Sequence, residues 1–369
     1  MIIGIDGNEA NVEHKVGVSV YTSNLLHYFQ SQASKDLSFI IYLRNSPLLH
    51  ADLPKETDSF SYKIIWGPLL WSQLFLPFHL WINKVLRKSL HVFFSPAHYI
   101  PRFCPYKTVV TIHDLSYIYF PDEFLKKDLY QLKNWTEYAL IKSSKIIAVS
   151  KTTKKDIIHE YSIPNEKIEV VYNGYTTYNL STTPCPLQPI SKPYFLSIGT
   201  LQPRKNLRLL IDAFSQFHKI HPEFKLILAG KKGWLYENIF KQVETLKMKD
   251  CVIFPGFVSE EEKNNLYQQA TAFILPSLYE GFGIPLLEAM AHGCPVLSSF
   301  SSSLPEVGAE ACLYFDPKES ADLVEKMNLI ITNIELRNKL VLAGKKRIET
   351  FSWLETGKNT LHILQSTHE

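Results

Sequence analysis

The most informative segment of the chain is Ser277-Leu278-Tyr279-Glu280-Gly281-Phe282-Gly283-Ile284-Pro285-Leu286-Leu287-Glu288-Ala289-Met290. It follows the short apolar run of residues 272–275, which predicts a buried strand. Two glycines then predict a turn, and Pro285 stands where helices commonly begin. The apolar residues after it recur at helical spacing, so the stretch predicts strand, turn and helix. The free N–H groups at such a helix start favour an anion, and Glu280 and Glu288 flank that site with hydroxyl-binding carboxylates.

Composition narrows the class of protein. A chain of 369 residues suggests two domains, and 46% hydrophobic with 20% charged residues is typical of a folded globular protein. A formal net charge of +3 without a long basic stripe argues against nucleic acid as a partner. The five cysteines are scattered and form no Cys-x-x-Cys pair, which favours a reducing compartment. With no signal-peptide pattern at the start, we expect a cytoplasmic protein.

Strand and helix patterns alternate in both halves of the chain, which predicts two doubly wound α/β domains with parallel sheets. The predicted strands are residues 1–6, 38–43, 62–66, 91–94, 108–112, 145–149, 168–171, 194–198, 225–229, 251–254, 272–275, 295–298 and 311–315. The predicted helices are residues 18–32, 71–88, 126–143, 151–161, 207–221, 236–246, 259–269, 285–292, 321–333, 335–350 and 353–365. A proline-rich linker is expected at residues 179–193, between domains 1–178 and 194–351.

A second loop carries two adjacent cations. The predicted strand 194–198 is followed by Gly199-Thr200-Leu201-Gln202-Pro203-Arg204-Lys205-Asn206. Arg204 and Lys205 at a strand end beside a helix start suit a pyrophosphate, although a solvated basic turn is the alternative. The chain has neither a P-loop nor Gly-x-Gly-x-x-Gly at either domain start, which argues against a P-loop nucleotidase and a nicotinamide dehydrogenase.

Other candidate residues also follow predicted strands or open helices. His113 follows strand 108–112 and either binds a substrate hydroxyl or is structural. Gly17 opens a helix, where its backbone could approach phosphate or sugar or simply start the helix. Phe257 and Val258 could line a base pocket, with core packing as the alternative for Phe257. No His and carboxylate spacing suggests a metal site.

The most lipid-like stretch is residues 66–82. Its Pro, Gln and His residues argue against a spanning helix. It is either a helix packed on a sheet or an interfacial segment followed by Lys84, Arg87 and Lys88. The interfacial interpretation expects Trp71 and Phe75 to be exposed.

The motif Glu280-Gly281-Phe282-Gly283 with Glu288 closely resembles the signature of retaining glycosyltransferases of family 4, and the resemblance spans nearly the whole chain. Residues 198–206 resemble that family's donor-phosphate loop, His113-Asp114 and Gly17 its N-terminal site, and Phe351-Ser352-Trp353 its entry into a terminal helix. The resemblance implies a GT-B fold: two Rossmann-like domains facing a cleft, with residues 352–369 crossing back to the first. It also implies acceptor binding mainly by the first domain, donor binding by the second, and no metal.

The same resemblance implies residue roles. Glu280 would contact the transferred sugar and Glu288 the ribose, while Lys205 with Arg204 would neutralise the leaving diphosphate. Backbone N–H groups would come from the following residues: Gly281, Phe282, Gly283 and Ile284. His113 would bind a sugar hydroxyl. Thr200 stands where many members of the family have Arg, so Arg204 would supply the second cation.

The Gly-Thr-Leu-x-Pro-Arg-Lys-Asn form resembles the mannosyltransferase-like branch that builds bacterial polysaccharides. GDP-mannose is therefore the expected donor, with UDP- or dTDP-sugars as alternatives. A lipid-linked or oligosaccharide acceptor at the cytoplasmic membrane face is expected. The alternatives are a GT-B sugar-nucleotide epimerase, a glycoside phosphorylase, or a non-catalytic nucleotide-sugar-binding scaffold.

Overall fold

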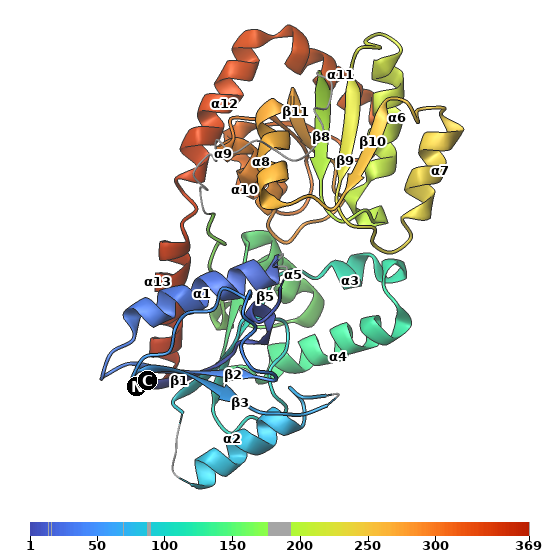
Figure 1. Cartoon of the computed structure of the whole chain (residues 1–369). Coiled ribbons are helices and arrows are strands. Elements are labelled where there is room, and N and C mark those ends of the chain that lie inside the picture. Colours follow the sequence, from blue (N-terminus) through green and yellow to red (C-terminus); the bar gives the residue numbers. More distant parts are fainter. Residues whose placement is uncertain (14, 16, 69, 87–89, 176–192, 369) are drawn as a thin grey trace. The chain divides into compact units, whose positions relative to one another are not determined.

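The computed structural model of the chain describes all residues except 14, 16, 69, 87–89, 176–192 and 369 (Figure 1). The chain divides into two compact units. Unit 1 comprises Met1–Ile118, Lys126–Gly174 and Phe351–Glu369, and unit 2 comprises Tyr119–Leu125 and Tyr175–Thr350. The predicted linker, residues 179–193, lies almost entirely outside the described residues.

Within the described residues, unit 1 is built on a seven-stranded parallel sheet in the order β3-β2-β1-β4-β5-β6-β7. Its strands are β1 Ile2–Asp6, β2 Ser38–Leu43, β3 Phe60–Ile64, β4 Val92–Ser95, β5 Lys107–Ile112, β6 Lys145–Ala148 and β7 Ile168–Val170. Its helices are α1 Val18–Gln32, α2 Phe75–Val85, α3 Ser116–Tyr119, α4 Lys126–Lys142, α5 Lys151–Tyr161 and α13 Trp353–His368. The central strands are almost continuously apolar because helices cover both faces of a parallel sheet.

The terminal helix α13 belongs to unit 1 and packs beside α1 (Figure 1). Gly357 allows the close approach, because a Cβ there would lie 2.3 Å from Cγ of Tyr28. The Thr356 hydroxyl donates a hydrogen bond to the carbonyl of Tyr172 at 2.8 Å, and Leu364 is fully buried in the core. The predicted return of the C-terminal helix to the first domain is confirmed.

Unit 2 has, among the described residues, a six-stranded parallel sheet in the order β10-β9-β8-β11-β12-β13. The strands are β8 Tyr194–Ile198, β9 Lys225–Ala229, β10 Val252–Gly256, β11 Ala272–Leu275, β12 Val296–Ser299 and β13 Cys312–Phe315. The helices are α6 Leu207–His218, α7 Glu237–Thr245, α8 Glu260–Gln269, α9 Ile284–Ala291, α10 Leu304–Gly308, α11 Ser320–Thr332 and α12 Ile334–Ile348. The chain order reverses between β8 and β11, the position where open α/β sheets bind ligands.

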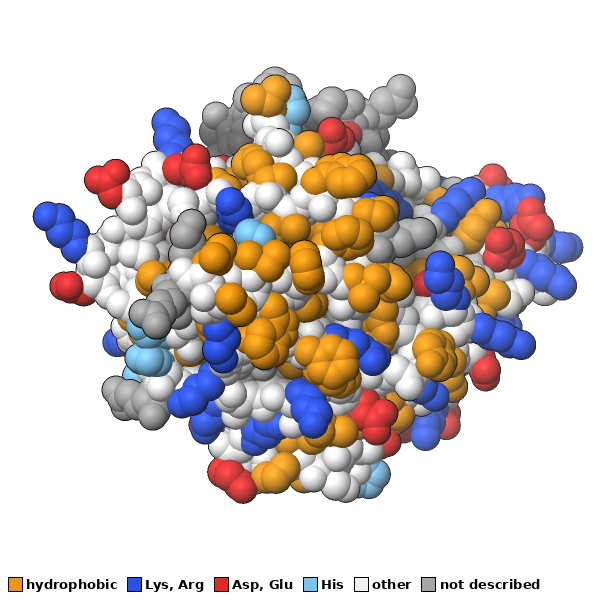
Figure 2. All heavy atoms as spheres, turned by 90° about the horizontal axis from the view of Figure 1, so that it is seen from below, with side chains coloured by type: hydrophobic (Ala, Val, Ile, Leu, Met, Phe, Trp, Pro, Cys, Tyr) orange, Lys and Arg blue, Asp and Glu red, His pale blue; other side chains and the backbone are white. Residues whose placement is uncertain are grey.

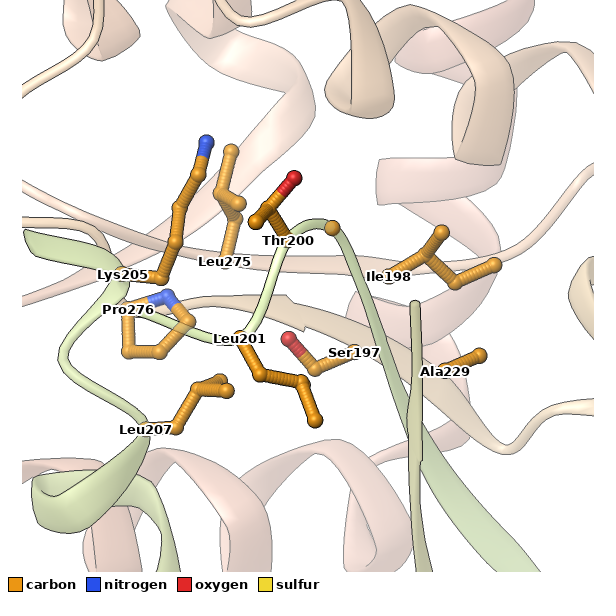
Figure 3. Close-up of a pocket in the computed structure, with 10 residues that line it drawn as sticks. Ser197, Ile198, Thr200, Leu201, Lys205, Leu207, Ala229, Leu275 and Pro276 are labelled. Carbon is orange, nitrogen blue, oxygen red and sulfur yellow. The ribbon is translucent and has the colours of Figure 1, made fainter. Parts of the chain in front are cut away.

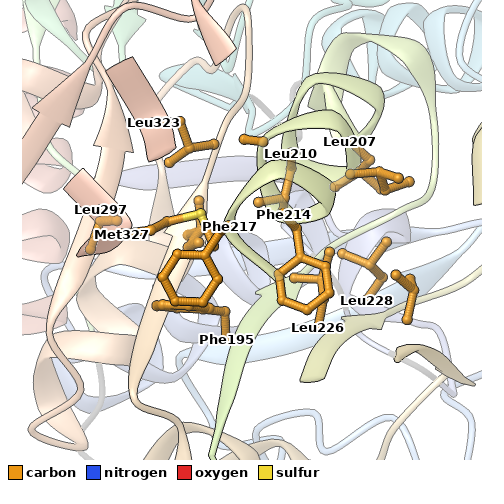
Figure 4. Packing of buried hydrophobic residues seen from close by; sticks show 14 of the residues in the cluster. Phe195, Leu207, Leu210, Phe214, Phe217, Leu226, Leu228, Leu297, Leu323 and Met327 are labelled. Atoms are coloured by element: carbon orange, nitrogen blue, oxygen red, sulfur yellow. The ribbon is translucent and has the colours of Figure 1, made fainter. Parts of the chain in front are cut away.

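The core of unit 2 holds the loop after β8 in place. Phe214 and Phe217 lie on the buried side of α6, and Met327 of α11 packs into the same cluster (Figure 4). The ring centroids of Phe217 and Phe195 of β8 are 5.2 Å apart. These rings pack α6 against β8, so both ends of the loop that joins the two elements are anchored in the core of unit 2.

One predicted helix needs correction, and two short helices are additional to the prediction. The helix predicted over residues 71–88 is shorter, Phe75–Val85, and Pro77 lies in its first turn, where a missing N–H costs nothing. The short helices α3 and α10 were not predicted, because five or fewer residues carry no clear period.

Candidate functional site

The two loops that the sequence singles out meet at the carboxyl ends of β8 and β11. These strands are neighbours in the sheet, so the loops after them run side by side, and the Leu278 N–H donates to the carbonyl of Arg204 at 2.9 Å. Arg204 and Lys205 sit in a 3₁₀ turn, Pro203–Lys205, just before α6. Strand, turn and helix are all present as predicted for residues 272–291.

The second of the two glycines is required by the geometry. Gly283 caps the N-terminus of α9 with φ 103°, a left-handed conformation that favours glycine. A Cβ at this position would also lie 2.6 Å from Cδ2 of Leu304. The backbone therefore turns tightly there and presents the start of α9 at the carboxyl edge of the sheet.

Glu280 is the centre of a buried charge cluster. Lys205 Nζ donates to Oε1 of Glu280, Arg204 Nη1 lies 3.4 Å from Oε2, and the Ser277 hydroxyl donates to Oε1 at 2.7 Å. The Glu280 residue is only 8% exposed. Burial opposes its charged form, but Lys205 and Arg204 outweigh burial and hold the pKa of Glu280 below its ordinary value.

Arg204 also fixes the backbone of the loop. Its Nη1 donates to the carbonyl of Tyr279 at 2.5 Å, in addition to its contact with Glu280. A guanidinium has several donors in one plane, so it can hold a carbonyl and a carboxylate together. Arg204 is thus bound to the glutamate loop at two points.

Sequence reasoning missed the serines that hold this loop from behind. They lie at the end of β12 or directly after it and are Ser299, Ser301, Ser302 and Ser303. The hydroxyls of Ser299 and Ser301 donate to the carbonyl of Ser277 at 2.6 and 2.8 Å. The Ser303 hydroxyl donates to the carbonyls of Glu280 and Phe282 at 2.8 and 3.0 Å. The Glu280 N–H donates to the Ser302 hydroxyl at 2.8 Å. The run of serines after a strand was the available signal.

Glu288 is held by two residues that were also missed. Lys263 Nζ donates to its Oε1 at 2.7 Å, and the Tyr267 hydroxyl donates to its Oε2 at 2.9 Å. Both donors lie on α8, one helical turn apart, so they share one face of that helix. The pKa of Lys263 is raised, because its attraction to Glu288 and Glu260 outweighs the effect of burial.

The glycine loop after β8 lies over a very small pocket. Figure 3 shows Thr200 and Lys205 pointing to one side of the loop, and Leu201 and Leu207 to the other. Its volume is about 10 Å³, which is about enough for one water molecule. Any larger ligand at this loop would therefore lie outside the pocket, and Thr200 is exposed there.

The residues after β10 differ from each other in exposure. Phe257 is 53% exposed, and Lys231 Nζ lies 4.6 Å from its ring centroid, so core packing of Phe257 is wrong. Val258 is buried.

Gly230, directly after β9, lies against the carbonyl of Gly199, the residue after β8. A Cβ at position 230 would be 1.9 Å from that oxygen, so only glycine fits there.

The short segment Tyr119–Leu125 contributes aromatic rings to unit 2. The ring of Tyr119 lies 5.3 Å, and that of Phe120 6.4 Å, from the ring of Tyr279. Burial raises the pKa of Glu123 in this segment, although Arg204 acts in the opposite direction. No sequence pattern associates these residues with the glutamate loop.

In unit 1, His113 follows β5 as predicted. Its Nε2–H donates to the carbonyl of Pro96 at 2.8 Å, because a carbonyl can only accept. Burial, with a contribution from His98, lowers the pKa of His113 to about 4. The ring is therefore neutral at pH 7 and its Nδ1 is a hydrogen-bond acceptor, suited to a sugar hydroxyl.

The other N-terminal predictions lie nearby in the chain. Asp114 accepts hydrogen bonds from the N–H and hydroxyl of Ser116, the first residue of α3, at 2.9 and 2.7 Å. Gly17 caps α1 with φ 47°. A Cβ at this position would have no heavy atom within 4 Å, so the space beside its backbone is open. Across the described ranges, no group of three His, Cys, Asp or Glu residues could hold a metal ion.

Comparisons with known families match both halves of the chain. The family described as Glycosyltransferase Family 4 matches residues 17–178, and the one described as Glycosyl transferases group 1 matches residues 187–347. The chain is 28% identical over 280 residues to O-antigen chain mannosyltransferase B of Escherichia coli, covering 74% of this chain and 73% of that protein. It is 32% identical over 212 residues to O-antigen chain mannosyltransferase RfbU of Salmonella typhimurium, covering 57% of each.

Solved structures share the fold over nearly the whole chain. A sucrose-phosphate synthase from Thermosynechococcus elongatus superposes with a TM-score of 0.74 at 17% identity, covering 99% of this chain and 98% of that one. Anabaena HepE in complex with UDP and glucose gives 0.73 at 18% identity, covering 99% of both chains. At this identity the likeness concerns the fold alone, which is GT-B with two Rossmann-like units, as expected.

Proposed function

Because the chain belongs to glycosyltransferase family 4, on its mannosyltransferase-like branch, we propose that it transfers mannose from GDP-mannose, with retention, to a lipid-linked or polysaccharide acceptor. It is a glycosyltransferase. The identity of the donor is supported by relatives named as mannosyltransferases. Action at the cytoplasmic membrane face is part of the same proposal.

The observation that carries the proposal is the charge cluster at the ends of β8 and β11. Two cations, Lys205 and Arg204, converge on one buried carboxylate, Glu280, beside the N-terminus of α9. The donor's diphosphate oxygens would compete for those cations and for the helix N–H groups. Glu280 would then be released from part of its ion pairing to accept a hydrogen bond from a sugar hydroxyl.

The proposed reaction breaks the bond between the anomeric carbon and the diphosphate oxygen. The acceptor hydroxyl attacks the same face, and the departing phosphate takes the acceptor proton, so the products are the glycoside and the protonated nucleoside diphosphate. Lys205 and Arg204 would stabilise the negative charge on that leaving group, a task that a metal performs elsewhere. His113, neutral with Nδ1 as an acceptor, would bind a hydroxyl of the donor sugar.

A screen of donors tests the proposal. We expect GDP-mannose to raise the thermal unfolding temperature more than UDP- or dTDP-sugars at equal concentration. A ligand at a hundred times its Kd stabilises the folded state by about 2.7 kcal/mol. A larger shift with UDP-glucose would contradict GDP-mannose as the donor. Identification of the reaction product distinguishes sugar transfer from epimerisation or phosphorolysis.

Tyr267→Phe tests the role of Glu288 as the ribose ligand. The variant removes one hydrogen bond to the Glu288 carboxylate, and we expect GDP to bind about fivefold more weakly, equivalent to about 1 kcal/mol, by calorimetry. Tyr194→Phe is the matched control, because this buried tyrosine hydroxyl donates to the carbonyl of Leu266 instead. Equal GDP affinity in the Tyr267 variant and wild type would remove Glu288 from the nucleotide site.

A further inference from the structure

Helix α2 of unit 1 is apolar on both sides, but the protein covers only one of them. Leu76 and Leu80 are buried in a cluster with Trp71, and Pro77 is also buried. The opposite side remains open to solvent. It consists of Leu74, Phe78, Trp81, Ile82 and Val85, which recur at helical spacing and which we call the α2 face.

The α2 face continues onto the flanking chain. Trp66 is 80% exposed, and the next residue, Gly67, packs against the Phe75 ring at the start of α2. Phe103 is 74% exposed, and its carbonyl accepts a hydrogen bond from the Trp81 indole at 2.8 Å. Seen from the side of α2, hydrophobic side chains gather on one face with Lys and Arg among and around them (Figure 2). A continuous group of exposed apolar side chains bordered by polar ones is typical of an interaction site.

The charge of this region identifies the partner. Between Asp58 and Asp114 the sequence contains no Asp or Glu but six Lys or Arg residues. Lys84 lies on α2, where its Nζ donates to the carbonyl of Pro105 at 2.6 Å. Lys63 of β3 lies close enough to His79 of α2 that its charge, together with the larger effect of burial, lowers the pKa of that imidazole. The segment that forms the α2 face thus carries cations and no carboxylate side chains, which complements an anionic surface.

We propose that the α2 face docks on an anionic lipid bilayer, with Trp66 and Trp81 at headgroup depth and Lys63 and Lys84 facing lipid phosphates. Tryptophan prefers the membrane interface, and basic residues are attracted to anionic leaflets. Helix α2 has 11 residues, too few to span a bilayer, and no helix among the described residues is both long and apolar enough to do so. The α2 face would therefore lie in the plane of the interface.

The expected exposure of Trp71 and Phe75 in the interfacial interpretation is wrong. Trp71 is buried and Phe75 is half-buried, because they precede or begin α2 on the side that packs against the sheet. The exposed positions are instead Phe78 and Trp81. Arg87 and Lys88, which the sequence placed after the helix, lie outside the described residues.

Vesicle flotation of the full chain tests the proposal. We expect wild-type protein to float with phosphatidylglycerol-containing vesicles and to remain unbound with phosphatidylcholine alone. Phe78→Ser with Val85→Ser should weaken binding at least about tenfold, since the apolar contribution is lost. The matched control is Ile220→Ser with Leu342→Ser, which removes similarly exposed apolar side chains from unit 2 and should bind like wild type.

A variant that changes charge tests the electrostatic contribution to lipid binding separately from the apolar contribution. Lys63→Glu should weaken binding on the order of tenfold, whereas Lys155→Glu on α5 makes the same charge change and should have little effect. Binding to neutral vesicles as strong as to anionic ones, equal losses in the controls, or no flotation of wild type would overturn the proposal. A dimer in sedimentation that Phe78→Ser dissociates would assign the α2 face to a second copy and overturn it too.

Lipid docking rests on the proposed function for the identity of the acceptor, but flotation needs neither donor nor acceptor. GDP calorimetry on the same variants should give wild-type affinity. Loss of flotation with GDP binding intact would support the α2 face, whereas failure of GDP binding in wild type would concern the proposed function alone.

Discussion

Lys205→Met is expected to lower kcat/KM for sugar transfer by about 10²–10³, because the leaving diphosphate loses a buried cation. Affinity for GDP should also fall, since a charge-assisted hydrogen bond contributes about 1.5–3 kcal/mol. Transfer assays and calorimetry measure the two effects. Lys326→Met is the matched control, because that lysine pairs with Asp322 and Glu325 on the surface of α11 and should have little effect.

The same variant would also destabilise the protein, so a second substitution separates stability from chemistry. Lys205→Met leaves Glu280 buried, with Arg204 as its remaining charged partner among the described residues, which costs up to about 3–5 kcal/mol. Adding Glu280→Gln neutralises the carboxylate and should recover much of the unfolding temperature. Because Glu280→Gln by itself is expected to lower transfer, the readout in the double variant is its affinity for GDP, which should stay as low as in Lys205→Met. Recovery of GDP affinity together with stability would show that Lys205 serves only the fold.

Glu280→Gln alone is expected to lower transfer by about 10²–10³ while GDP affinity stays within about threefold of wild type. Glutamine keeps the size of the side chain and can still accept hydrogen bonds, but the charge that would orient the sugar and respond to the transition state is lost. Glu325→Gln, at an exposed ion pair, is the matched control. Equal losses of GDP affinity and transfer would contradict the division of roles between Glu280 and the cations.

The pH dependence of stability reports on the same cluster. The folded-state pKa of Glu280 is depressed below its ordinary value of 4.5, so its ionised form stabilises the folded protein. That contribution is fully present above pH 4.5 and is lost as pH falls through the folded-state pKa. The difference in unfolding temperature between wild type and Glu280→Gln should therefore be largest near neutral pH and shrink in acid. A constant difference would show that the ion pairs do not hold the charge.

Much of this site could be predicted from the sequence because the chemistry and the local backbone are encoded nearby. Apolar runs of strand length predict buried parallel strands, and the loops after them carry the cations, the glutamates and Gly283. Gly283 is a local requirement of a left-handed turn. The predicted residue types and positions of the two loops therefore agree with the structure.

The pairing of these residues depends on the sheet order. Lys205 and Glu280 are 75 positions apart in the sequence and meet because β8 and β11 are adjacent. Lys263 reaches Glu288 because α8 packs beside α9, and no local pattern names that partner.

Exposure is likewise decided by packing. Helical spacing groups Phe78, Trp81 and Val85 on one side of α2, but spacing alone does not tell which side the sheet covers. The sequence was sufficient to predict the longer strands and helices, the chemistry of the loops after β8 and β11, and the apolar character of α2. Only the tertiary structure decided which charges pair and which apolar side stays uncovered, because both depend on contacts between segments distant in the chain.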